Sequence, residues 1–382
     1  MAVNIGNVPK NPEKSFKVDF FHLKVKIFLI LKIISCDFHT LQGYPFKSKL
    51  IFPTIALMIF ISCGLNLPSA LADDKTAAGK ATCLIIFAAG FQIVFKVLAI
   101  CLYAKDIRCL ICWFGEVEEN AFWTSLGVPL DRHLRTTLHY LKLTIKFVAL
   151  TFFVTGNLMA FKFFWTDILI FYVPLLSRGY KFLCQYFILF AMAVFVFISE
   201  TLLLILGFFF VAIINIFLDA IKKLDEIKFI ESSKKVPMRT YHKKHVEILK
   251  KLKDLENIFS GIQTAQLASS LPMAIGTFYL LRLYPNEIIY YTMIFTILGQ
   301  FFAICLFGEC IHSRTEKIFS ILYLTRWYDM KKEDQMILMM MMRMSIEPFC
   351  LKAADMYEIN LQTFVNVTKL SFSFCAFLYA LH

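Results

Sequence analysis

The sequence lacks the short motifs that most enzyme classes need. It contains no P-loop, no His-Glu-x-x-His zinc motif, no Gly-x-Ser-x-Gly nucleophile elbow and no paired carboxylates in a plausible cleft. Cys109 and Cys112 are the only close cysteine pair, and no second pair or histidine cluster completes a zinc site. We therefore expect no enzymatic activity, no metal and no other cofactor, and mostly free thiols among the 11 cysteines.

The sequence also lacks repeats at solenoid periods and the inverted repeat of short broken helices that is typical of many secondary transporters. A membrane transporter nevertheless stays as an alternative. The first residues are polar and contain lysine, without the apolar core and small-residue cleavage site of a signal peptide. We therefore expect no cleaved signal peptide.

Hydrophobic residues, by contrast, are abundant. They make up 58% of the 382 residues, with 42 phenylalanines and a mean hydropathy of +0.65. A soluble domain would be about 45–50% apolar. The excess lies in long apolar runs, which must be helical because backbone groups in lipid need internal partners, and barrel strands would be short and alternating. The sequence therefore predicts an all-α membrane protein.

Seven apolar runs define the expected transmembrane helices. These are Leu50–Leu67, Ala81–Tyr103, Leu143–Phe164, Phe182–Phe217, a run ending near Leu283, Ile288–Phe307 and Leu361–Leu381. The net charge of +12 comes mostly from lysines between the runs, and the connections rich in Lys and Arg all fall on one side. By the positive-inside rule, we expect a cytosolic N-terminus and an extracellular C-terminus, the reverse of a G-protein-coupled receptor, and no nucleic-acid partner.

Several helices are expected to extend beyond the membrane. The run Phe182–Phe217 is longer than a bilayer requires and continues into charged residues without a proline. His242–Ile262 and Lys331–Met344 are amphipathic. These extensions, about 214–260 and 310–345, either form a cytosolic anchor bundle or rest on lipid headgroups. We divide the chain into a cytosolic or interfacial segment, 1–48, and a seven-helix domain, 49–382.

The final helix, expected at about 357–381, has one face that starts polar and becomes apolar towards its end. On a helical wheel this face carries Asn366, Leu370, Ser373, Phe377 and Leu381. An apolar ring at the outer end of a pore can gate by dewetting. Periodicity alone leaves pore lining and ordinary packing open. Lys369 lies roughly 80° from this line, and a pore-facing lysine ring would repel cations.

Three charged residues lie at membrane depth. Lys96 and Glu200 stand at similar depths, which predicts a structural ion pair near the cytosolic edge, although each could instead reach the interface separately. Lys162 lies near the outer end of its helix, where we expect its long side chain to extend to the interface.

The last 75 residues carry a set of motifs in a fixed order. Gly308-Glu309, Ser313, Tyr323 and Trp327-Tyr328 come first, followed by Ser345 and Pro348, Ala353-Ala354, Leu361 with Phe364, and Ser371-Phe372-Ser373-Phe374. This order resembles the C-terminal signature of insect odorant receptors, except that Phe372 and Phe374 stand where the family often has tyrosine. The sister gustatory receptor family stays as an alternative. It ranks second, because the Thr-Tyr and Gln-Phe pairs expected in its last helix are absent here.

The resemblance implies a subunit of an odorant-gated, non-selective cation channel. The chain is shorter than the family's co-receptor is expected to be, and it lacks the long insertion of that subunit between helices four and five. The resemblance therefore implies a ligand-tuning subunit, which assembles with the co-receptor into a heterotetramer through the cytosolic anchor. It also implies a pore lined by the last helix, and a location among the lipids of the plasma membrane of olfactory neuron dendrites.

Family members hold small volatile organic ligands in the outer half of helices two, three, four and six. Each candidate aromatic here has ordinary packing or an interfacial belt as its alternative role. The candidate ligand-binding residues are Phe87, Phe91, Phe153, Asn157, Tyr186, Phe190, Tyr291, Ile294 and Phe295.

Overall fold

The computed structural model describes residues 20, 23–31, 51–72, 77–119, 122–123, 130–166, 169–171, 177–226, 237–354 and 356–380. Their regular structure is helical apart from one short hairpin, which confirms the all-α prediction. The helices are α2 (Ile51–Ala72), α3 (Ala77–Leu102), α4 (Ala104–Glu119), α6 (Leu130–Trp165), α7 (Arg178–Glu226), α8 (Met238–Leu283), α9 (Ile288–Leu324), the 3-10 turn η3 (Trp327–Asp329), α10 (Lys332–Met344) and α11 (Leu361–Ala380). Residues 23–31 are also helical, and most of the expected segment 1–48 lies outside the described residues.

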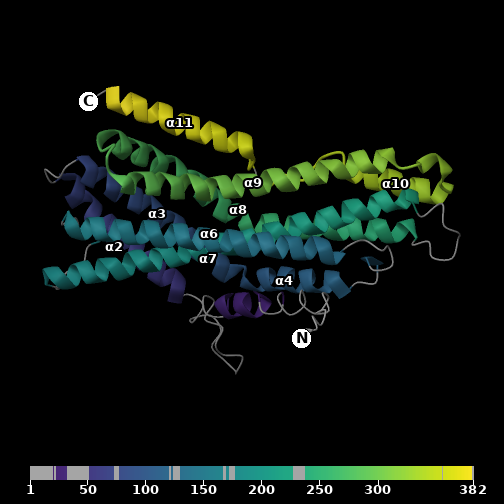
Figure 1. Ribbon diagram of the computed structural model, residues 1–382, viewed down its shortest axis with the longest axis horizontal. Coiled ribbons are helices and arrows are strands. Elements are labelled where there is room, and N and C mark those ends of the chain that lie inside the picture. The colour runs from purple at the N-terminus through teal and green to yellow at the C-terminus, as the bar shows by residue number, and fades with distance from the viewer. Residues whose placement is uncertain are drawn as a thin grey trace, which may run out of the picture.

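The long helices α6, α7, α8 and α9 pack side by side along the longest axis of the molecule (Figure 1). The longest, α7, has 49 residues. At about 1.5 Å per residue it far exceeds a hydrocarbon core of about 30 Å. Its length agrees with the predicted extension beyond the membrane, which stays a prediction. Helices α8 with 46 residues and α9 with 37 are also longer than a bilayer needs.

Hydropathy alone identifies four membrane-span candidates within the described residues: Gly79–Leu102, Arg132–Trp165, Gly179–Leu224 and Ile288–Leu324. Ile51–Leu65 of α2 is apolar but shorter. The two other expected spans fall on α8, whose first half is highly charged, and on α11, which carries Asn366 and Lys369. Membrane spans are therefore present in this fold, and the count of seven stays a prediction.

One end of the bundle is built from charged helices with apolar faces. There α10 packs against α8 and α9, and α4 packs against α7 and α8. Helix α4 lies in the connection between two expected spans, yet Ile107, Leu110 and Phe114 give it a buried face. Trp113 of α4 donates a 2.5 Å hydrogen bond to the Glu247 carboxylate of α8, which fixes the two helices together.

The last helix lies along the outside of α8 and α9, over the half of the bundle opposite α10 (Figure 1). It begins at Leu361 rather than near 357, because β1 (Lys352–Ala353) and β2 (Tyr357–Glu358) first form an antiparallel hairpin. Asn360 then caps the helix, since its Oδ1 accepts the backbone N–H of Thr363 at 2.9 Å. The hairpin and this cap set where α11 starts.

Candidate functional site

A pocket of about 140 Å³ lies between α3, α6, α7, α8 and α9, and we refer to it as the buried pocket because its lining residues are buried or half-buried. None of its lining residues is exposed. The wall consists largely of Ile, Met, Ala and Phe side chains, which is typical of sites for small organic ligands. Its residues are Ile85, Ile86, Ala89, Gln92, Ile93, Phe152, Thr155, Gly156, Met159, Leu189, Met192, Ala193, Val196, Met273, Met293, Thr296, Ile297 and Gln300.

Four uncharged polar side chains interrupt this apolar wall. Thr155 of α6 and Thr296 of α9 join their hydroxyls across the pocket at 2.9 Å. Gln92 of α3 donates its amide N–H to the amide oxygen of Gln266 in α8. Gln300, the fourth, lies one helical turn from Thr296 on α9. The pocket therefore offers hydrogen-bonding atoms without any formal charge in its lining.

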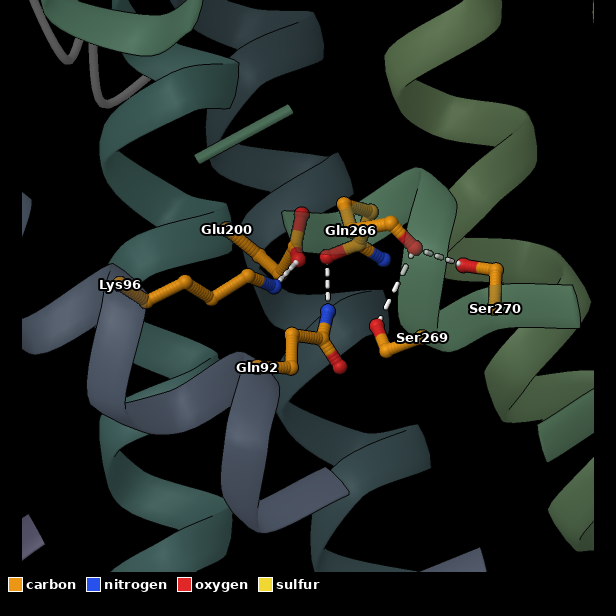
Figure 2. Close-up of polar contacts among 6 residues, drawn as sticks. All are labelled: Gln92, Lys96, Glu200, Gln266, Ser269 and Ser270. Carbon is orange, nitrogen blue, oxygen red and sulfur yellow. Dashed lines mark hydrogen bonds and ion pairs between the residues drawn. The ribbon is translucent and has the colours of Figure 1, made fainter. Parts of the chain in front are cut away.

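A polar cluster joins three helices next to the pocket (Figure 2). Lys96 lies one turn after Gln92 on α3 and forms an ion pair with Glu200 of α7, with side chains only 1% and 5% exposed. The hydroxyls of Ser269 and Ser270 donate to the backbone oxygen of Gln266 at 3.1 and 2.6 Å. The predicted Lys96–Glu200 pair is present, and it is buried rather than solvated.

A second hollow of about 150 Å³ opens on the outer surface of the seam between α6 and α7. Four of the predicted ligand residues line it: Phe153, Asn157, Tyr186 and Phe190. Tyr186 donates its hydroxyl to Asn157 Oδ1 at 3.3 Å. Phe152, Gly156, Leu189 and Ala193 line both this groove and the buried pocket, so they form a shared wall between them.

Three more predicted residues, Tyr291, Ile294 and Phe295, line a larger groove of about 760 Å³ between α6, α7 and α9. Glu200 and Phe364, the latter from the first turn of α11, also line this groove. It therefore connects the polar cluster with the base of the last helix.

The remaining two predicted ligand residues face α2. Phe87 stacks on Phe60 with ring centroids 4.8 Å apart, and Phe91 lies 6.4 Å from the same ring. Altogether, the nine predicted residues fall in three places, and none of them lines the buried pocket. The predicted residues are mostly aromatic, and they do not include Gln92, Thr155, Thr296 or Gln300. The sequence feature that could have identified these four is an uncharged polar side chain inside an apolar run.

The last helix has one covered and one uncovered face. Ser371 and Cys375 are buried against the bundle, with exposed fractions of 0% and 4%. The predicted pore residues Asn366, Leu370, Ser373 and Phe377 are all exposed on the other face, whereas Leu381 lies outside the described residues. Lys369 is exposed as well. Because the exposed face is broad, the wheel offset of Lys369 does not remove it from this face.

Lys162 behaves differently from its expectation. Its ammonium group lies 2.7 Å from the Glu287 carboxylate and 4.4 Å from the ring centre of Tyr290. It therefore ties the C-terminal end of α6 to the start of α9 instead of only reaching towards the interface.

Comparison with known proteins agrees with this architecture. The family model described as 7tm Odorant receptor matches residues 76–372. Two solved structures of the insect olfactory receptor OR5 from Machilis hrabei have the same fold. One is the complex with eugenol (TM-score 0.72, 13% identity), and the other is a second structure of the same receptor (TM-score 0.73, 14% identity). Each comparison covers 95% of this chain and 100% of the other.

Comparison with curated protein sequences gives no match. The family match nevertheless spans well over half of the chain, from α3 to the middle of α11. This chain belongs to the insect odorant receptor family, whose members are membrane receptors rather than enzymes.

Proposed function

We propose that this chain is the ligand-tuning subunit of an odorant-gated, non-selective cation channel in the plasma membrane of olfactory sensory neurons. It crosses the membrane seven times, with a cytosolic N-terminus and an extracellular C-terminus, and it assembles with the co-receptor into a heterotetramer. The observation that carries the proposal is the uncovered face of α11, which changes from Asn366 to Leu370 and Phe377. In a membrane, an exposed helix face of this kind is covered by lipid, by other subunits or by the water of a pore. The polar residue at its start favours a water-filled pore between subunits.

The buried pocket is the proposed ligand site, because its lining has no exposed residue, is mostly apolar and carries no charge. The grooves around it, with the nine residues predicted from the sequence, supply a route and flanking contacts for a small volatile ligand. A ligand that binds the open arrangement more tightly than the closed one shifts the population towards the open channel. Some residues line both the pocket and a groove. A ligand that displaces them in the pocket therefore also changes the shape of the groove.

Current recordings with paired cysteine variants test the pore assignment. Ser373→Cys should let a membrane-impermeant, cationic methanethiosulfonate reagent reduce the odorant-evoked current of cells that express this chain with the co-receptor. Ser371→Cys is the matched control, since Ser371 lies two residues away and is fully buried. Equal effects at both positions, or odorant responses that vanish on G-protein block while surviving pore substitutions, would contradict the proposal.

Expression of each subunit separately tests the assembly. This chain alone should give almost no current, and addition of the co-receptor should give odorant-evoked cation current. Full odorant responses from this chain without the co-receptor would rule out the assignment as a tuning subunit.

A further inference from the structure

The two threonine hydroxyls in the pocket have no proton left for a ligand. Thr296 donates its single hydroxyl proton to the backbone oxygen of Thr292 at 2.8 Å, because a carbonyl can only accept. In the 2.9 Å bond between Thr155 and Thr296, Thr155 must then be the donor. Both protons are committed, and each oxygen keeps acceptor capacity beside the pocket.

The two glutamines do not reverse this balance. Gln92 gives one amide N–H to Gln266, which leaves its second N–H as a donor and its own amide oxygen as an acceptor, so it favours neither type of ligand. Gln300 offers a donor and an acceptor alike, and therefore does not distinguish ligands by hydrogen-bond type. With no charged side chain in the lining, a neutral ligand is favoured over an ion.

The space limits the ligand to a small molecule. An apolar cavity of about 150 Å³ holds one benzene molecule, and this pocket has about 140 Å³. A ring or chain of roughly six to ten heavy atoms would therefore fill it. One polar group of the ligand would lie at the threonine pair, and the rest would lie against Ile, Met and Ala side chains.

We propose that the pocket selects small neutral alcohols and phenols, with the Thr155–Thr296 pair accepting the ligand hydroxyl proton. This inference rests on the proposed ligand site and names its ligand class. A ketone, ether or hydrocarbon of the same shape would offer no proton to the remaining acceptor positions of the threonine pair, and an unsatisfied buried acceptor lowers affinity. The expected discrimination is about ten-fold in dissociation constant.

Binding of three probes to the purified full-length chain in lipid nanodiscs tests the proposal. Phenol carries a donor, anisole keeps the oxygen without the proton, and toluene replaces the hydroxyl by a methyl group. Ligand-detected NMR titration should give the tightest binding for phenol, after subtraction of binding to empty nanodiscs. Equal affinity for phenol and anisole, or no binding by any of the three, overturns the proposal.

Variants of the pair sharpen the test. In Thr155→Val with Thr296→Val, the preference for phenol over anisole should fall to about one. In Thr296→Val alone, Thr155 regains its proton as a donor, so anisole should gain relative to phenol. Thr296→Ser keeps the hydroxyl and should keep the preference. A preference for phenol that survives the double substitution overturns the role of the threonines.

Thr292→Val is the matched control. Thr292 lies one turn from Thr296 on α9, donates its hydroxyl to the backbone oxygen of Ile289 at 2.8 Å and does not line the pocket. Its removal should leave the phenol preference unchanged. These titrations do not depend on channel current, so the two proposals can fail separately. A silent channel that keeps the preference for phenol contradicts only the channel proposal. Robust currents without that preference contradict only the proposed ligand class.

Discussion

Gly308 of α9 lies directly against the backbone carbonyl of Ile359, the residue just before the cap of α11. A Cβ atom at position 308 would overlap that carbonyl oxygen. Glu309 adds a second tie, since its carboxylate accepts the Leu361 backbone N–H at 3.4 Å. Only glycine permits this approach, which sets where the last helix leaves α9.

Gly308→Ala should therefore displace the start of α11 and suppress channel current. The overlap is with backbone rather than with a flexible side chain, so we expect a loss of about 1–3 kcal/mol in the free energy of unfolding. Gly299→Ala is the control on the same helix, because no heavy atom lies within 4 Å of a Cβ there. Thermal unfolding of the purified variants measures both, and an unchanged melting temperature in Gly308→Ala would contradict the close approach.

The Lys96–Glu200 pair should be sensitive to the loss of one partner. Lys96→Met leaves the Glu200 carboxylate buried without its counter-charge, which destabilises by about 3–5 kcal/mol. The double variant Lys96→Met with Glu200→Leu removes both charges and should recover most of this loss. A double-mutant cycle of melting temperatures checks the coupling, and additive effects would show that the two side chains act independently.

Ala193 lies in the wall shared by the α6–α7 groove and the buried pocket. Ala193→Phe should fill pocket space and weaken phenol binding by at least about ten-fold, since a ring replaces a volume comparable to the ligand. Ala149→Phe is the comparison, because Ala149 lines only the outer groove. If both variants weaken binding equally, the groove rather than the pocket holds the ligand.

The exposed Lys369 should oppose cation flow if α11 lines the pore. Its ammonium group would stand on the same face as Asn366 and Ser373, where a positive charge repels passing cations. Lys369→Gln should therefore raise single-channel conductance in cells that also express the co-receptor. Lys352→Gln, in the hairpin before α11, provides a charge-matched control. Identical conductance in Lys369→Gln and the unmodified channel would place this side chain away from the ion path.

His245 predicts a pH dependence of stability. The imidazole is fully buried, stacks on Phe217 at 5.5 Å and lies 3.4 Å from the Ser345 hydroxyl. Burial, together with a smaller contribution from the nearby His242, lowers its pKa from 6.5 to about 4. The unfolded chain therefore binds this proton more tightly than the folded chain does.

Stability from His245 is therefore complete above about pH 6.5 and is lost as the pH falls towards 4, by on the order of 2–3 kcal/mol. Thermal unfolding between pH 7.5 and 5 measures this loss. His245→Gln, which does not titrate, should show a shallower decline over the same range. Parallel curves for the two proteins would exclude His245 as the source.

The sequence predicted the features that depend on local pattern. Long apolar runs predicted the long helices, and the residues that the wheel of α11 grouped, Asn366, Leu370, Ser373 and Phe377, are all exposed. The helix α4 was missed because its charges masked the spacing of its apolar residues.

The pocket could not be predicted in the same way. Gln92, Thr155 and Thr296 are brought together from α3, α6 and α9 by the rotation of each helix about its axis, which packing across the bundle decides. Lys162 also shows this limit, since its partner Glu287 is 125 residues away in the sequence.

The buried ion pair has a consequence for how such a receptor can change over generations. Replacement of either Lys96 or Glu200 alone leaves a buried unpaired charge and a destabilised protein. The two residues are therefore expected to be kept or lost together during evolution. Thr155 and Thr296 carry no charge and can be exchanged one at a time at a modest energetic cost. Ligand preference can therefore change through single substitutions in the pocket, while the Lys96–Glu200 pair and the helix packing around it are retained.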